Sequence, residues 1–254
     1  MIRLALVLLA FLSAPFAALG EEVVAGLSQN RISINANFDG SEILVFGAVK
    51  RTEPVGDVPP LEVIITVSGP RRPVMVRRKE KLALIWVNRD AVEVDAAPSF
   101  YAVATSGKLR NILTDTEDLR HRISPERAVR SVGAPVTITD ASKFTDALIR
   151  IKTEEGFYTL LEDRVQVREE TLFDASIALP ANLVEGNYTT RIFLTRGGRV
   201  INRYETVIYV QKVGLERFLY NLAHEQPLAY GALSLVIAIA AGWGASALFR
   251  YIRS

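Results

Sequence analysis

The highest density of charge in the sequence lies in residues 71–81, where Arg71-Arg72 is followed by Arg77-Arg78-Lys79-Glu80-Lys81. Alternate residues of a strand share one face, so Arg77 and Lys79 would present two cations side by side. With aromatic side chains nearby, such cations form an anion-binding surface, because guanidinium and ammonium groups donate charge-assisted hydrogen bonds to oxyanions. Two other interpretations are a solvated strand end paired with nearby acids, and contact with a negatively charged lipid surface. The candidate ligand-binding residues are Arg77, Arg78, Lys79, Trp86, Asn88 and Tyr101.

The other residues that could take part in a reaction do not form a recognisable catalytic motif. Nucleophilic hydrolysis needs a serine or cysteine with a histidine base, and the chain has no cysteine, no Gly-x-Ser-x-Gly and no Ser-x-x-Lys. His121 could serve as a base, but it lies in Asp118-Leu119-Arg120-His121-Arg122, a charged helix end typical of a solvated histidine. His224 lies on the polar face of another short helix. We therefore expect no catalytic residue and no enzyme activity.

Metal and cofactor sites have no sequence signature either. The two histidines are 103 residues apart and no thiol is present, which excludes zinc-ribbon, iron–sulfur and haem-attachment spacings. The chain also lacks a Walker loop and a Gly-x-Gly-x-x-Gly motif, so nucleotide binding has no support. We predict no metal and no cofactor.

An apolar segment opens the chain. Residues 1–20 include 16 of the hydrophobic set, start with Met1-Ile2-Arg3 and end with Ala18-Leu19-Gly20 before two glutamates. A positive start, an apolar run and small residues at −3 and −1 are typical of a secretory signal peptide. The run is short for a membrane span and contains Pro15. We predict a signal peptide over 1–20, cleaved after Gly20, with an uncleaved anchor as the alternative.

A second apolar segment, residues 228–249, runs for 22 residues without a charge. At 1.5 Å per residue, a helix of this length crosses a hydrocarbon core of about 30 Å. Arg250 and Arg253 follow it, and the positive-inside rule then places the 250–254 tail in the cytoplasm. We predict a single-pass protein of the inner membrane with residues 21–227 in the periplasm.

Net charge gives no argument for a nucleic-acid partner. Of the 30 basic residues, Arg3, Arg250 and Arg253 lie in the two ends, whereas all 28 acidic residues lie between them. Residues 21–249 therefore carry 27 basic against 28 acidic residues, a net charge of −1. A basic surface of the kind that binds phosphate backbones is not expected.

Two features near the C-terminus predict contacts with other molecules. Ala238, Gly242 and Ser246 recur every four residues in the apolar segment, a small-residue spacing that lets membrane helices pack closely. Residues 214–226 carry apolar side chains at helical spacing and predict an amphipathic juxtamembrane helix. This helix could lie on the membrane, dock on a partner or pack on its own domain.

The region between the ends is predicted to be mainly β with a helical insertion. Short alternating runs separated by Pro and Gly predict an Ig-like β-sandwich-type domain over 21–98. Helical spacing over 109–119 and 143–152 predicts helices within a mixed segment, 99–164. The β pattern resumes over 165–213, with Gly197-Gly198 as a hairpin turn. Whether the two β segments form one domain or two is open at this level.

The sequence also carries a series of short motifs in order along the predicted mature chain. They are Phe38-Asp39-Gly40-Ser41-Glu42-Ile43-Leu44-Val45-Phe46-Gly47-Ala48, Val76-Arg77-Arg78-Lys79-Glu80, Ile85-Trp86-Val87-Asn88, Pro98-Ser99-Phe100-Tyr101-Ala102-Val103, Thr171-Leu172-Phe173, Leu179-Pro180-Ala181-Asn182, Glu185-Gly186-Asn187-Tyr188, Tyr230-Gly231 and Gly242-Trp243. In these motifs the chain resembles the Alph_Pro_TM family of alphaproteobacterial transmembrane proteins. The resemblance implies an exported ectodomain with one C-terminal span and no established activity, and it points to a sulfite-exporter-type permease as a neighbouring membrane protein.

Together these features predict a membrane-anchored periplasmic accessory or binding module that interacts with an envelope or membrane protein. The alternative function is a small-anion binding protein that assists transport of an oxyanion such as sulfite. The first rests on the absent catalytic motifs and the small-residue stripe, and the second on Arg77, Arg78 and Lys79.

Overall fold

The computed structural model describes residues 21–35, 38–51, 58–82, 84–130 and 140–253, so the predicted signal peptide lies outside the described residues. Its strands are β1 (Glu22–Leu27), β2 (Arg31–Ile34), β3 (Ser41–Lys50), β4 (Glu62–Ser68), β5 (Arg71–Leu82), β6 (Ile85–Pro98), β7 (Tyr101–Thr105), β8 (Tyr158–Leu161), β9 (Gln166–Arg168), β10 (Leu172–Leu179), β11 (Gly186–Arg196) and β12 (Arg199–Lys212). Its helices are α2 (Leu109–Ile112), α3 (Asp115–His121), α4 (Pro125–Ala128), α5 (Ala141–Glu154), α6 (Leu215–Glu225) and α7 (Pro227–Arg253).

Two sheets pack face to face and form a sandwich. A four-stranded sheet has the order β1-β3-β10-β9, and a six-stranded sheet has the order β2-β12-β11-β4-β7-β8. Alternation along β3 builds the core, because Ile43 and Val45 are fully buried whereas Leu44 and Phe46 are exposed on the opposite face. Residues of both sheets, such as Ile177 and Ile192, belong to the same hydrophobic cluster.

A second hydrophobic cluster covers the outer face of the six-stranded sheet. Ile64, Tyr101 and Phe193 on this face pack with apolar residues of the helical segment, including Ile112 and Leu148. Strand β4 is therefore buried on both faces, which explains why apolar residues occupy consecutive positions, Val63 to Ile65, instead of alternating with polar ones. The predicted mainly β fold with a helical insertion and one C-terminal apolar helix is confirmed.

The two β segments of the sequence contribute to the same two sheets. In the four-stranded sheet β3 pairs with β10, and in the six-stranded sheet β4 pairs with β11. Each sheet thus contains strands from both 21–98 and 165–213, and both segments share one core.

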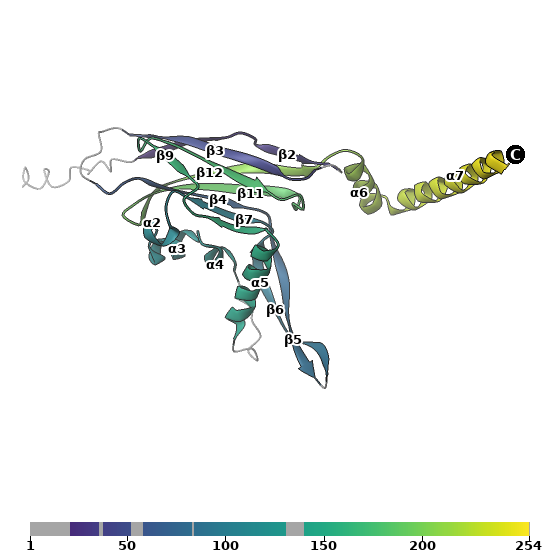
Figure 1. Ribbon diagram of the computed structural model, residues 1–254, viewed down its shortest axis with the longest axis horizontal. Coiled ribbons are helices and arrows are strands. Elements are labelled where there is room, and N and C mark those ends of the chain that lie inside the picture. The colour runs from purple at the N-terminus through teal and green to yellow at the C-terminus, as the bar shows by residue number, and fades with distance from the viewer. Residues whose placement is uncertain (1–20, 36–37, 52–57, 83, 131–139, 254) are drawn as a thin grey trace, which may run out of the picture.

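Local structure differs from the sequence prediction at two places. The helix predicted over 109–119 is divided into α2 and α3, because the side chain of Thr114 accepts a hydrogen bond from the Glu117 amide and starts a new helix. The sequence predicts only short strands over 21–98, whereas β5 and β6 form one long antiparallel hairpin. Figure 1 shows this hairpin projecting away from the sandwich with α5 beside its base.

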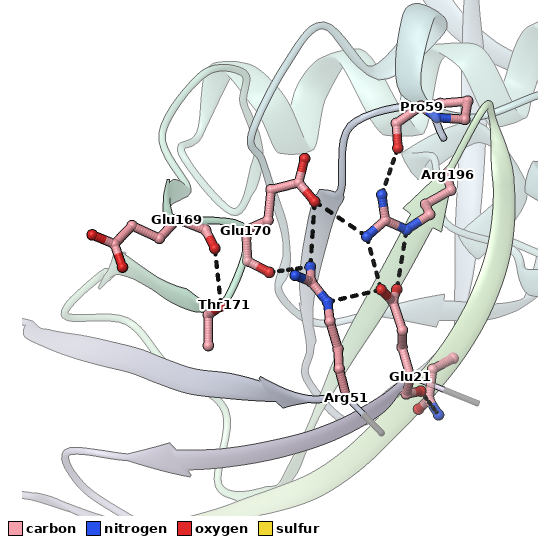
Figure 2. A network of polar contacts seen from close by, with 8 residues as sticks. Glu21, Arg51, Pro59, Glu169, Glu170, Thr171 and Arg196 are labelled. Carbon is pink, nitrogen blue, oxygen red and sulfur yellow. Dashed lines mark hydrogen bonds and ion pairs between the residues drawn. The ribbon is translucent and has the colours of Figure 1, made fainter. Parts of the chain in front are cut away.

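A polar network fixes the start of β1 at one end of the sandwich (Figure 2). The Glu21 carboxylate accepts hydrogen bonds from Arg196 Nε and Nη2, at 3.1 and 2.7 Å, and from Arg51 Nε at 2.9 Å. Glu170 contacts the same two guanidinium groups at 3.3 and 3.4 Å. The side chains of Arg196 and Glu21 are only 12% and 16% exposed, so the network is shielded from water.

The amphipathic helix α6 and the long helix α7 extend beyond the other end of the sandwich (Figure 1). Within the segment 214–226, where the sequence predicts an amphipathic juxtamembrane helix, the structure has the helix α6. The side-chain amide of Asn202, on β12, donates a hydrogen bond to the Glu21 carbonyl oxygen at 2.7 Å. Strand β12 ends ten residues later, at Lys212, and α6 begins at Leu215. At about 3.3 Å per residue, Glu21 and the start of α6 are about 33 Å apart along β12.

Candidate functional site

The β5–β6 hairpin carries five of the six candidate ligand-binding residues, but its central cation is already paired. Arg78 lies opposite Asp90 and forms an ion pair with it, in which Arg78 Nε and Nη2 both donate to Asp90 Oδ2. Its Nη1 also contacts Asp140 at 2.7 Å, and its guanidinium lies 5.1 Å from the centre of the Phe144 ring. Both carboxylates raise the pKa of Arg78 above its ordinary value. Arg78 therefore connects the hairpin to α5, and its charge is neutralised.

The other hairpin candidates lie on open surface. Arg77, Lys79 and Asn88 are exposed, and Asn88 pairs with Lys79 across the ladder. Near the tip, Trp86 is 68% exposed and Leu84 is 86% exposed. The hairpin thus presents separate cations along its strands and an apolar end.

The structure does not bring Tyr101 to this surface. Tyr101 lies on β7 with no exposed area, and its hydroxyl donates a hydrogen bond to the Ile123 carbonyl at 2.7 Å. Burial raises the pKa of Tyr101 to about 12, although the nearby Arg191 opposes this shift. Strand β5 has 12 residues, so the base and the tip of the hairpin are about 36 Å apart. Tyr101 follows the base and Trp86 lies near the tip, so these two side chains cannot contact the same small ligand.

Tyr101 instead contacts an arginine that the sequence analysis did not select. Arg191 lies in the middle of β11, and its Nη2 is 3.2 Å from the Tyr101 hydroxyl. Arg71, Arg191 and Arg203 line a pocket of about 360 Å³ on the outer face of the six-stranded sheet. Arg191 could have been found from the sequence, because it is a charged residue inside an otherwise mainly apolar strand. A charge at such a position needs hydrogen-bond partners or a counter-charge.

His121 lies close to this pocket and is less exposed than the sequence indicated. Its side chain is 20% exposed, and its ring packs edge-on against Phe193 at 5.6 Å between centroids. Burial lowers the pKa of His121, and Arg203, Arg120 and Arg191 act in the same direction, while Glu117 opposes them. Within the part of the chain that the structure describes, no three His, Asp or Glu side chains gather as a metal site would require.

The C-terminal helix has the length and composition of a membrane span. Within α7, residues Pro227–Ser246 have a mean hydropathy of 1.7, and none of this stretch is buried against the rest of the chain. A soluble core helix of this apolarity would be covered by its own domain. The helix therefore exposes its apolar surface on all sides, as a membrane span does.

A family model agrees with this reading of the helix. It is described as "Putative transmembrane protein (Alph_Pro_TM)" and matches residues 22–251. The chain belongs to this family. No curated protein matches the chain. As an Alph_Pro_TM member with one apolar helix near its C-terminus, the chain fits a membrane-anchored protein whose sheet-rich domain lies outside the span.

The small-residue stripe of α7 is uncovered in the structure. Ala238, Gly242 and Ser246 are exposed, and a Cβ atom added at Gly242 would meet nothing within 4 Å. On α6, Phe218 and Tyr220 are also exposed. The described part of the chain leaves the predicted packing face uncovered.

Proposed function

We propose that this Alph_Pro_TM protein is a membrane-anchored, non-catalytic accessory or binding module of the inner membrane. Its sheet-rich domain stands in the periplasm and contacts an envelope or membrane protein. The observation that carries the proposal is the apolar helix α7, which is unburied by its own domain and has a free small-residue face. A permease of the sulfite-exporter type is the partner we propose.

The proposed topology includes removal of residues 1–20. Glu21 lies about 33 Å from the start of α6, at the opposite end of β12, and its side chain is held in the polar network. If residues 1–20 stayed attached as a membrane anchor, this anchor and helix α7 would have to enter the same membrane from opposite ends of the sandwich. Cleavage after Gly20 removes this conflict and lets the domain stand away from the membrane on α6 and α7.

The partner contact that we propose joins the α7 stripe to a helix of the partner. Gly242→Leu should reduce co-purification of the partner from detergent extracts about tenfold, because a leucine side chain keeps the two helices from close approach. The matched control is Gly244→Leu, which adds the same side chain about 200° around the helix. Both added side chains meet open space within the chain itself, so neither should alter the ectodomain.

Quantitative mass spectrometry measures how much partner protein co-purifies with the tagged, full-length chain. The comparison requires that the variants be present in the membrane at equal levels. Loss of the partner in Gly242→Leu but not in Gly244→Leu is the expected result. Equal recovery of the partner by the two variants, or no specific membrane protein in the wild-type sample, would contradict the proposed contact.

The alternative function, binding of an oxyanion to assist its transport, has less support at the hairpin than the sequence indicated. Arg78 is neutralised by Asp90 and Asp140, which leaves Arg77 and Lys79 as exposed cations. Exposed single cations bind anions weakly because water and salt screen them. The observation that favours oxyanion binding lies elsewhere, in the arginine-lined pocket of the six-stranded sheet.

A further inference from the structure

The pocket is built on one face of three neighbouring strands. Arg191 on β11 lies opposite both Thr66 on β4 and Glu205 on β12, and Thr189 lies opposite Ser68. Because side chains two residues apart share a face, Thr189 and Arg191 point to the same side of the sheet. The pocket of about 360 Å³ is lined by Ser68, Gly69, Pro70, Arg71, Asn187, Thr189, Arg191, Arg203 and Glu205.

Arg191 is held in place by neutral acceptors. Its Nε donates to the Thr66 hydroxyl at 3.2 Å, and its Nη1 donates to the His121 carbonyl at 2.7 Å. Its Nη2 donates to the Arg122 carbonyl at 3.0 Å and to the Tyr101 hydroxyl. Among the described residues no carboxylate lies within ion-pair distance of this half-buried guanidinium. The side chain is thus immobilised by neutral groups, and its positive charge has no ion-pair partner among the described residues.

The other charges around the pocket leave an excess of positive charge. Arg71 and Arg203 also line it, and the one acidic lining residue, Glu205, is 3.5 Å from Arg203 Nη2. That contact is long for a charge-assisted hydrogen bond, and both side chains are about half exposed. Glu205 can therefore turn to solvent when another anion occupies the pocket.

We propose that this pocket binds an oxyanion group of the sulfate or phosphate type, as the inorganic ion or as a small ester. The guanidinium groups of Arg71 and Arg203 can match such oxygens with paired hydrogen bonds, whereas Arg191, which has one N–H group left, contributes mainly its positive charge. The Ser68 and Thr189 hydroxyls and the Asn187 amide add neutral donors in the same pocket. The volume exceeds that of a single inorganic ion, which leaves space for an ester substituent. The pocket would serve the alternative function, oxyanion binding, without residues 77–79. Binding in the pocket also does not require the proposed contact between α7 and a partner helix.

Isothermal titration of the full-length chain in detergent tests the site, with sodium sulfate, sodium phosphate and glycerol phosphate as probes at constant ionic strength. Arg203→Gln should weaken binding about tenfold, because one charged donor is lost while the half-exposed position tolerates glutamine. Glu205→Gln should strengthen binding, because a competing negative charge is removed. Arg89→Gln, which removes an equally exposed arginine from the hairpin, should leave binding unchanged.

His121 supplies a readout that does not depend on heat. Sulfate in the pocket should raise the pKa of His121, measured by NMR, since a nearby anion favours the charged imidazolium. His224 on α6, the other histidine of the chain, does not line the pocket, and its ring signals serve as the internal reference. Binding of glycerol phosphate without binding of the inorganic ions would assign the pocket to esters, whereas the reverse would assign it to free ions.

Two results would overturn the proposal. One is the absence of heat with all three probes together with an unchanged His121 pKa. The other is an equal loss of binding in Arg203→Gln and Arg89→Gln, which would show attraction to the general surface charge instead of the pocket.

Discussion

Gly47→Ala should destabilise the chain by about 3 kcal/mol, at the upper end of the usual cost of overpacking a core. Gly47 lies opposite Phe173 in the four-stranded sheet. An added Cβ would overlap Phe173 Cζ and would stand 2.8 Å from the Val24 carbonyl oxygen. Phe173 is buried and Val24 presents backbone at this contact, so neither can move without disturbing the sandwich.

Gly26→Ala is the matched control for this substitution. Gly26 lies in the neighbouring strand opposite Phe46, and its added Cβ would stand 3.0 Å from Phe46 Cζ. Phe46 is exposed and can shift, so the expected change is within about 0.5 kcal/mol. Thermal unfolding of the detergent-solubilised chain, followed by far-UV circular dichroism, should show a midpoint lower by roughly 6 to 12 °C for Gly47→Ala alone. Equal midpoints for the two variants would refute the packing argument.

Arg196→Ala should lower the free energy of unfolding by about 2 kcal/mol at pH 7, because it leaves the shielded Glu21 carboxylate without its main partner. Burial raises the pKa of Glu21, but the hydrogen bonds and charges of Arg196 and Arg51 outweigh burial and hold it below 4.5. A carboxylate with a lowered native pKa stabilises the fold above its unfolded pKa and loses this contribution as the pH falls through the native value. The difference between wild type and Arg196→Ala should therefore narrow below pH 4.5.

Denaturant unfolding at several pH values measures this difference. Arg199→Ala, a change at an exposed arginine of the same hairpin, should have an effect within about 0.5 kcal/mol. A double-mutant cycle with Glu21→Gln then isolates the pair energy. A difference that stays constant from pH 7 to pH 3 would show that the packing of the Arg196 side chain, and not its charge, provides the stability.

Much of the fold follows from local patterns in the sequence. Alternation over β3 and β10 predicted strands with one buried face, and Gly197-Gly198 predicted the turn between β11 and β12, where both glycines have positive φ. The length of the β5–β6 hairpin was not predictable in this way. Its outer half has no buried face, so hydrophobic periodicity does not record it.

The candidate site was harder to predict because its contacts join distant parts of the chain. The sequence analysis grouped Tyr101 with Arg77 and Lys79 by their chemistry and nearness in sequence. The structure pairs Tyr101 with Arg191, which is 90 residues away, and the carbonyls that hold Arg191 come from the end of α3. These groups come together only because the end of α3 contacts the six-stranded sheet, where the His121 ring packs against Phe193.

Thiol labelling of single-cysteine variants tests the central claim, a periplasmic ectodomain on a single C-terminal span, most directly. The chain has no cysteine, so Lys81→Cys on the exposed hairpin and Ser254→Cys in the tail each introduce a unique thiol. In spheroplasts, a membrane-impermeant maleimide should modify the hairpin cysteine at once and the tail cysteine only after detergent is added. The purified chain should also have the mass of residues 21–254. Labelling of the tail cysteine in intact spheroplasts, with the hairpin cysteine protected, would contradict the proposed topology.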